Sequence, residues 1–169
     1  MGRFDEAPNH LSGLLTLTAR LVQDRLNEGL RPLGLSYAQA AALVRLWRSP
    51  DPLVLQRDLV NSLALSRATG TLLITDLEQL GLLTRRPDDV DGRRQVLELT
   101  RRGRALEQPV FDVIEQLQLE IASVIGDDAV ATTMHSLTRL LGHLEPNAAP
   151  ALPTADRDTA RRVPEPQRP

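Results

Sequence analysis

Arginine is concentrated in one short stretch of this 169-residue chain. Residues 85–104 contain seven arginines against four acidic residues, whereas residues 105–145 contain one arginine against seven acidic residues. Lysine is absent, and the guanidinium of arginine is a planar, permanently charged donor that suits phosphates and base edges. Although the formal net charge is only −2, the chain has a local positive cluster of the kind that binds a polyanion, beside an acidic half.

Residues that could support other chemistry are few and scattered. The chain has no cysteine, which excludes disulfides, cysteine metal sites and thiol redox switches. His10, His135 and His143 are far apart and lack the spacing of metal ligands. An enzyme is the alternative class, but it would need a nucleophile–base pair, a metal cluster or a phosphate-binding loop, and none is evident. We therefore expect no catalytic residue, no metal and no cofactor.

The composition of the chain also argues against single-stranded nucleic-acid binding and against a membrane location. Only four aromatic residues are present, too few for surfaces that stack single-stranded bases. No apolar run approaches the ~20 residues of a membrane-spanning helix. The N-terminal sequence MGRFDEAPNH lacks the apolar core of a signal peptide. We expect a cytoplasmic protein without a membrane partner.

Helical spacing of apolar residues dominates both ends of the chain. Residues 11–30 form one amphipathic stretch, and Ser36 with Gln39 predicts a capping box that opens a second helix ending at Trp47. The spacing returns over 106–125, where Pro109 should kink or interrupt the helix, and again in a last helix opened by residues 126–128.

The middle of the chain predicts two short helices and a hairpin. Residues 56–63 and 66–80 are separated by a tight turn, and Ser66 is the expected N-cap of the second helix. Gly81 has the position of a Schellman stop. Segments 82–86 and 95–99 then have the pattern of strands joined by a charged loop containing Asp-Gly.

Two short helices followed by a hairpin with an arginine-bearing tip make a winged helix-turn-helix. The chain resembles the MarR family of bacterial winged-helix regulators over about residues 11–144, through LALSRATGTLLITDLEQLGLLTRR (63–86) and DGRRQVLELTRRG (91–103). The expected fold is mainly α, with about six helices and a small β-hairpin wing. We expect a DNA-binding domain over 36–103, dimerisation helices over 11–35 and 104–145, and a proline-rich disordered tail over 146–169.

This resemblance implies a transcriptional regulator that binds double-stranded DNA with a near-palindromic site. A recognition helix would enter the major groove while an arginine of the wing lies in the minor groove. At 100° per residue, Gly70, Leu73, Ile74, Leu77 and Leu80 share the core side of the recognition helix, and the opposite side is the candidate reading face. The expected DNA-binding residues are Ser66, Arg67, Ala68, Thr71, Leu72, Thr75, Arg85, Asp91, Arg93 and Arg94.

Within the wing, the resemblance implies that Arg93 enters the minor groove and that Asp91 holds its guanidinium. The alternative is an exposed salt bridge of little energetic value. Arg85, Arg86 and Arg94 are assigned to phosphates or to no specific contact.

Three positions depart from the family pattern. Leu72 stands where a base is common, Asp76 where arginine is usual, and Leu55 where a hydroxyl caps the helix before the turn. An acid near phosphates repels them, so these departures leave the operator sequence open.

The resemblance also implies a two-fold homodimer and a response to a small molecule. The outer apolar stripes would bury against a second copy, although a longer monomeric bundle is the alternative. Members of the family are commonly repressors that leave DNA when a small aromatic or phenolic anion binds. The candidate contacts for such an anion are Arg20, Tyr37 and Trp47. Each of these also has a structural interpretation, as a solvated or helix-end residue. A winged helix that binds only protein is disfavoured by the Arg93-Arg94 pair.

Overall fold

The computed structural model describes residues 10–144, which are mainly helical with one small sheet. The stretch 146–169, expected to be disordered, lies outside the described residues. The described part has seven α-helices, one 3-10 helix and three strands, so the predicted mainly α class is confirmed. The elements are α1 Leu11–Leu30, η1 Arg31–Leu33, α2 Tyr37–Trp47, β1 Val54–Leu55, α3 Gln56–Ser62, α4 Arg67–Gln79, β2 Leu83–Pro87, β3 Gln95–Leu99, α5 Arg101–Ala105, α6 Glu107–Ile125 and α7 Asp127–Leu144.

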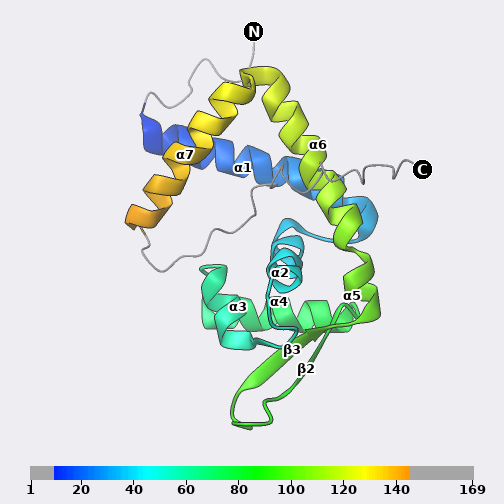
Figure 1. Cartoon of the computed structure of the whole chain (residues 1–169). Coiled ribbons are helices and arrows are strands. Elements are labelled where there is room, and N and C mark those ends of the chain that lie inside the picture. The colour runs from blue at the N-terminus through cyan, green and yellow to red at the C-terminus, as the bar shows by residue number, and fades with distance from the viewer. Residues whose placement is uncertain (1–9, 145–169) are drawn as a thin grey trace, which may run out of the picture.

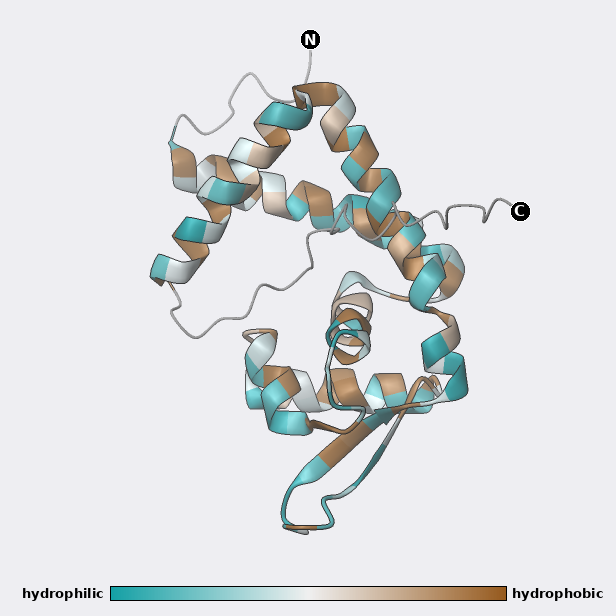
Figure 2. Ribbon diagram, in the orientation of Figure 1, coloured by the Kyte–Doolittle hydropathy of each residue, from teal (hydrophilic) through white to brown (hydrophobic). Residues whose placement is uncertain are grey.

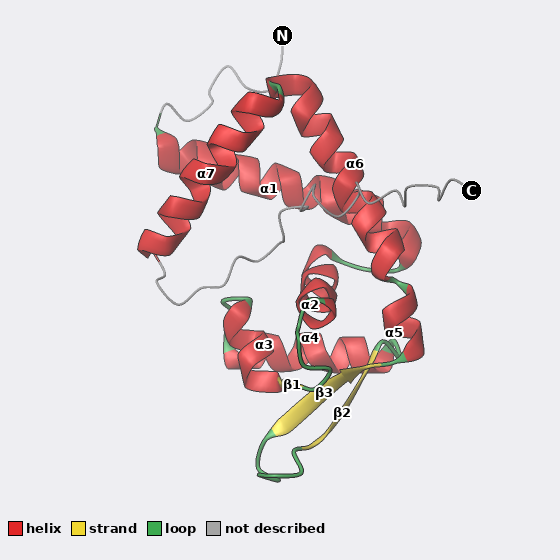
Figure 3. Cartoon of the chain, viewed as in Figure 1, coloured by secondary structure: helices red, strands yellow, loops and turns green. Residues whose placement is uncertain are grey.

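The elements form two groups (Figure 1). Helices α1, α6 and α7 make one group, in which α6 packs against both of the others. Helices α2, α3 and α4 with the sheet make the second group, and α2 contacts α1 and α6 of the first. Figure 3 shows that β2, β3 and the loop between them, together the wing, extend farthest from the first group.

Helix α2 is the centre of the core because nearly every side of it is covered. Its predicted capping box is present: Ser36 Oγ accepts from the Gln39 N–H at 3.3 Å, and Gln39 Oε1 accepts from the Ser36 N–H at 2.9 Å. Figure 2 shows that hydrophobic residues are frequent along α2 and β3, and six residues of α2 are buried. The fully buried large side chains are Leu30, Leu43, Val44, Leu59, Ile74, Leu77, Leu82, Leu83, Leu97 and Val110.

The end of α4 has the predicted Schellman geometry. Gly81 adopts φ +68°, which glycine tolerates without steric cost. The Leu82 N–H donates to the Leu77 carbonyl at 3.0 Å, and the Gly81 N–H donates to that of Glu78 at 2.9 Å. The chain therefore turns directly from α4 into the wing.

The sheet has the order β1-β3-β2 with both pairs antiparallel. The predicted hairpin is confirmed, with Leu83 opposite Leu99 and Pro87 opposite Gln95. Strand β1 was not predicted, since a two-residue strand has no periodicity of its own. Its pairing of Val54 with Leu97 fastens the start of α3 to the wing.

The end of the wing packs closely against α5 around Thr100 and Gly103. Thr100 caps α5 by accepting from the Gly103 N–H at 3.0 Å, and its hydroxyl donates to the Gly81 carbonyl at 2.7 Å. A Cβ on Gly103 would collide with the carbonyl oxygen of Leu82, so only glycine permits this approach.

Trp47 also contacts Gly103, from the end of α2. Its Nε1 donates to the Gly103 carbonyl at 3.2 Å, and its ring centroid is 6.1 Å from that of Phe111 in α6. The Arg48 guanidinium stands 5.7 Å from the Phe111 centroid. The end of α2 is thereby fixed to α5 and α6.

The helix expected over 106–125 begins after a break rather than at a kink. Helix α5 ends at Ala105, Leu106 separates the two helices, and Pro109 lies in the first turn of α6. Proline lacks an N–H, and the N–H groups of a first turn have no partner within the helix, so the position suits it.

Among residues 10–144, no helix has the length and apolar character needed to cross a bilayer. The same residues contain no cluster of three or more His, Asp and Glu side chains that could hold a metal ion.

Candidate nucleic-acid interface

A tight turn places α4 on the outside of the second group. Ala64 adopts φ +52°, a left-handed conformation that is uncommon for a residue with a Cβ. Ser66 then caps α4 as predicted, with its Oγ accepting from the Thr69 N–H at 3.1 Å. The hydroxyl also lies 2.8 Å from that of Thr69, so a DNA contact by Ser66 would have to share it.

The two sides of α4 differ as the helical angles predicted. Gly70, Leu73, Ile74 and Leu77 are buried, while Leu80 is half-buried. On the opposite side Arg67, Ala68 and Leu72 are exposed, and Thr71 and Thr75 are half-buried. Leu72 is 67% exposed, an unusual fraction for a large apolar side chain.

One reading-face hydroxyl is already engaged. Thr71 Oγ1 donates to the Arg67 carbonyl at 2.8 Å, a common arrangement for threonine inside a helix. In this rotamer its oxygen is left as an acceptor only. The contact expected of Thr71 would therefore have to be with a donor group.

The wing loop is ordered by two aspartates. Asp88 Oδ1 accepts from the Val90 N–H at 3.1 Å, and Asp91 Oδ1 accepts from the Arg93 N–H at 3.1 Å. The Arg94 N–H donates to the Asp91 carbonyl at 2.8 Å. These bonds close the tip into turns and leave Val90 93% exposed at its apex.

The expected guanidinium partner of Asp91 was wrong. Asp91 Oδ2 is 3.0 Å from Arg94 Nε, whereas Arg93 is bound to Asp91 only through its backbone. The reason is local geometry: Asp91 Oδ1 accepts the backbone N–H of Arg93, and Oδ2 then meets the side chain of Arg94, the next residue. Within residues 10–144, the Arg93 side chain has no ion pair.

The remaining wing arginines are paired inside the chain. Arg85 Nη2 is 2.9 Å from Glu78 Oε2 in α4, and both side chains are about one-third exposed. Arg86 Nη1 is 3.0 Å from Asp89 Oδ1. Arg85 is thus paired with a residue near the end of α4, the helix that carries the candidate reading face.

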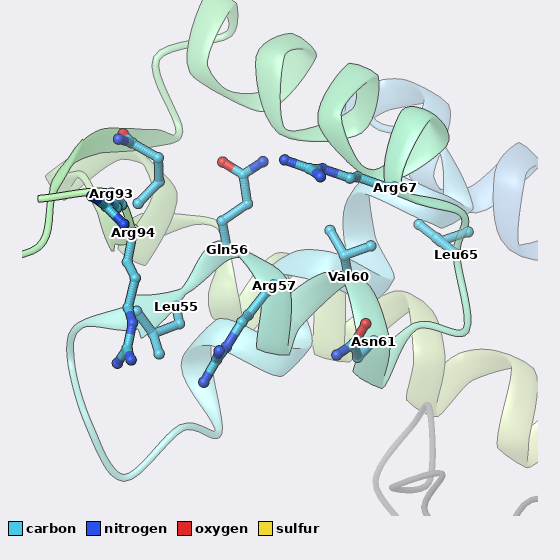
Figure 4. A pocket seen from close by; sticks show the side chains of 10 residues that line it. Leu55, Gln56, Arg57, Val60, Asn61, Leu65, Arg67, Arg93 and Arg94 are labelled. Atoms are coloured by element: carbon cyan, nitrogen blue, oxygen red, sulfur yellow. The ribbon is translucent and has the colours of Figure 1, made fainter. Parts of the chain in front are cut away.

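A hollow of about 410 Å³ lies between α3, the start of α4 and the end of the wing loop where it enters β3 (Figure 4). We call it the arginine hollow, because four arginines and no carboxylate line it. Three of the ten lining residues, Arg67, Arg93 and Arg94, were expected to contact DNA. The lining residues are Leu55, Gln56, Arg57, Val60, Asn61, Leu65, Arg67, Arg93, Arg94 and Gln95.

Sequence reasoning missed Gln56 and Arg57 of α3. Arg57 is an exposed arginine beside Asp58, and its Nε is 3.2 Å from Asp58 Oδ1, so in the sequence it looks like an ordinary surface pair. The signal that could have found it is its place in the first turn of the helix before the recognition helix. Leu55 supplies no side-chain cap there, as expected from its apolar side chain.

The candidate ligand contacts are not brought together. Tyr37 and Trp47 are the first and last residues of α2, so about 15 Å of helix separates them. Arg20 is exposed in the middle of α1, with its Nε 3.9 Å from Asp24 Oδ2. Trp47 is occupied by Gly103 and Phe111, so these three side chains do not form one site for a small anion.

The MarR family pattern matches residues 33–94, which span α2, α3, α4, β2 and the loop of the wing. A relative in Bacillus subtilis (strain 168), the organic hydroperoxide resistance transcriptional regulator, is 30% identical over 105 residues. That match covers 62% of this chain and 70% of the relative. The chain belongs to the MarR family. It is a DNA-binding transcriptional regulator, and the MarR family comprises regulators rather than enzymes.

Solved structures of MarR proteins agree with this assignment. A crystal structure of MarR is 26% identical, with a TM-score of 0.69, and covers 79% of this chain and 96% of MarR. Reduced AbfR bound to DNA is 25% identical, with a TM-score of 0.61, and covers 77% of this chain and 87% of AbfR. The winged helix-turn-helix expected from the sequence is thus confirmed.

Proposed function

We propose that this MarR-family chain is a homodimeric repressor that reads a near-palindromic duplex and is released by a small molecule. Helix α4 enters the major groove, and Arg93 of the wing lies in the adjacent minor groove. Residues 36–103 act as the reading unit, while 11–35 and 104–145 make the dimer. The contacts are assigned to the outer side of α4, to Ser66 at its start, and to the wing around Asp91, Arg93 and Arg94.

The arginine hollow carries the DNA part of this proposal. It brings guanidinium groups from α3, α4 and the wing to one side of the reading unit, with no lining carboxylate to repel phosphates. A helix fits the major groove, and a thin hairpin tip can reach the neighbouring minor groove. Asp76 is exposed on α4 and is not among the lining residues, so the departure from the family pattern leaves the hollow positive.

Exposed apolar side chains support the dimer. Nine of the eleven large apolar residues that are exposed among residues 10–144 lie on α1, α6 and α7, a concentration that marks an interaction surface. The other two are Leu72 and Val90. The nine are Leu11, Leu14, Leu21, Leu119, Val124, Ile125, Leu137, Leu141 and Leu144.

Light scattering at micromolar concentration tests the dimer. We expect twice the mass of the chain, and L119E with L141E should reduce that mass because each places a charge on the apolar face. L72E, which adds the same charge to α4, is the matched control and should leave the mass unchanged. A stable wild-type monomer would contradict the dimer.

The small-molecule response is proposed to be non-covalent. The Bacillus relative is named for organic hydroperoxide resistance, but the 169 residues of this chain contain no cysteine that a peroxide could oxidise. Because the Arg20, Tyr37 and Trp47 side chains are apart, we assign no residue to the effector. A ligand lowers DNA affinity only if it prefers the spacing of the two reading units that does not bind.

Selection of bound fragments from random duplex DNA tests the whole proposal. We expect a near-palindromic sequence whose half-sites lie about one DNA turn apart. Repeating the selection with aromatic acids present would reveal an effector as loss of bound fragments. The binding constant should also fall steeply with salt, with a log–log slope near −0.9 for each phosphate contacted. No enriched sequence, together with a flat salt response, would contradict the proposed function.

A further inference from the structure

The arginine hollow faces the DNA backbone if the proposed function is correct. Helix α4 and the wing would occupy neighbouring grooves, and the sugar–phosphate strand that separates two grooves must then pass between them. The hollow lies in that interval, because α3, the start of α4 and the end of the wing loop line it. A backbone phosphate is the group that we place there.

The four guanidinium groups of the hollow are not equivalent. Arg57 is paired with Asp58 at 3.2 Å and Arg94 with Asp91 at 3.0 Å. Within the described chain, Arg67 and Arg93 have no ion pair. Arg67 therefore brings a full positive charge to the hollow, but no carboxylate fixes where that charge lies.

Gln56 stands beside Arg67 with an unused acceptor. Its Oε1 is buried and has no hydrogen-bond partner among the described residues. In Figure 4 the Gln56 amide stands between Arg67 and the wing arginines, and the Arg67 guanidinium extends toward it. In this orientation the amide nitrogen of Gln56 faces Arg67 and the oxygen faces the wing. Turning the amide by half a rotation exchanges the two atoms, which have nearly the same shape, and presents the unused acceptor to the Arg67 guanidinium.

We propose that Gln56 is a positioning residue for Arg67 in DNA binding. When a backbone phosphate enters the hollow, Gln56 Oε1 accepts one N–H of the Arg67 guanidinium, and the other N–H groups are directed at the phosphate. Arginine has five N–H donors, so it can serve both acceptors at once. Holding a long side chain in advance lowers the conformational entropy lost on binding. This inference rests on the proposed function and adds a residue that contacts no DNA itself.

The test measures binding of the full chain to a random-sequence duplex by fluorescence anisotropy. A phosphate contact does not depend on base sequence, so no operator is needed. Q56M keeps the length of the side chain and removes the acceptor. We expect it to weaken binding about three- to tenfold, as for the loss of one hydrogen bond. Q79M, the same exchange at the exposed last residue of α4, about 18 Å of helix from Arg67, is the matched control and should leave affinity unchanged.

A double-mutant cycle separates positioning from a general structural role. R67A alone should weaken binding and reduce the salt slope by about 0.9. In the R67A background, Q56M should change affinity less than about twofold, because the group that it positions is gone. Two results would overturn the inference while leaving the proposed function intact. In one, Q56M weakens binding equally in the wild-type and R67A backgrounds. In the other, R67A weakens binding but Q56M does not.

A direct measurement covers the case in which Q56M disturbs α3. The Nε–H signal of Arg67, identified by its disappearance in R67A, should be protected from hydrogen exchange in the wild-type complex with DNA. Q56E retains an acceptor at the same reach and should keep that protection, whereas an unprotected Arg67 signal in the wild-type complex would overturn the inference. Failure of the wild-type chain to bind any duplex would instead contradict the proposed function.

Discussion

Asp91 contacts two consecutive arginines in different ways. Its Oδ2 is 3.0 Å from Arg94 Nε, while its Oδ1 accepts from the backbone N–H of Arg93 at 3.1 Å. One carboxylate thus neutralises the second arginine and shapes the turn that exposes the first. We therefore expect Arg93 and Arg94, although adjacent in sequence, to contribute differently to DNA affinity.

Substituting Arg93 should weaken DNA binding more than substituting Arg94. R93A removes an unpaired guanidinium, and we expect about tenfold weaker binding with a salt slope reduced by about 0.9. R94A removes a charge already shared with Asp91 and should cost less. Anisotropy titrations over a series of salt concentrations measure both variants, and circular dichroism checks that each is folded. Equal losses for the two variants would contradict the assignment of Arg93.

Two serine caps form a matched pair for separating stability from DNA binding. Ser36 is exposed and caps α2, the central helix of the core, whereas Ser66 caps α4 at the reading face. S36A and S66A should each lower the free energy of unfolding by about 1 kcal/mol. Only S66A should also weaken DNA binding, since it alters the end of α4 that faces the hollow. Denaturant unfolding and anisotropy measure the two effects, and weakened binding by S36A as well would argue against a local role for Ser66.

Gly70 should be intolerant of alanine even though alanine favours helix. A Cβ at this position would lie 2.6 Å from Val60 Cγ1, and Val60 is buried and β-branched, so it cannot turn aside. We expect G70A to lower the free energy of unfolding by about 1–3 kcal/mol, which exceeds the gain in helix propensity of about 1 kcal/mol.

The double variant G70A/V60A supplies the control. Removing the two methyl groups of Val60 makes room for the new Cβ, so G70A should cost much less in the V60A background. Denaturant unfolding of the four proteins measures this coupling. Additive losses would show that α3 and α4 adjust their separation instead.

Tyr37 should make the protein less stable in strong alkali. Burial raises the pKa of the Tyr37 hydroxyl above its ordinary value of 10.0. The neutral form is favoured in the folded state, so its contribution is complete below about pH 10 and is lost as pH rises toward the folded pKa. Y37F cannot ionise and should lose less free energy of unfolding above about pH 10. If the free energy of unfolding falls equally with pH in the wild type and in Y37F above about pH 10, the effect is contradicted.

Local signals in the sequence predicted the elements well. Ser36 with Gln39, Ser66 and Gly81 each fix a helix end through bonds to residues a few positions away, and all three have the predicted geometry. The hairpin was predicted from the strand-like pattern of segments 82–86 and 95–99 and from the Asp-Gly pair in the loop between them. The helix after Thr100 was less well placed, because the alternative positions of Pro109 within a helix cannot be distinguished by spacing alone.

Features that depend on distant partners were not predictable. Strand β1 exists only because Val54 meets Leu97, more than forty residues later. Gln56 and Arg57 acquire their proposed role only when α3 is placed beside α4 and the wing. The choice of Asp91 between two adjacent arginines depends on the direction of each side chain in the loop, which residue types do not specify.

The Trp47–Gly103 hydrogen bond gives this protein a built-in optical probe. Trp47 is the single tryptophan of the chain, so intrinsic emission excited in its absorption band reports on one place, where α2, α5 and α6 meet. Any movement of the reading unit against the long helices must alter the polarity around that indole. Stopped-flow fluorescence on the unlabelled protein can therefore time such a movement, with no dye attached to either surface that DNA or a second chain would cover.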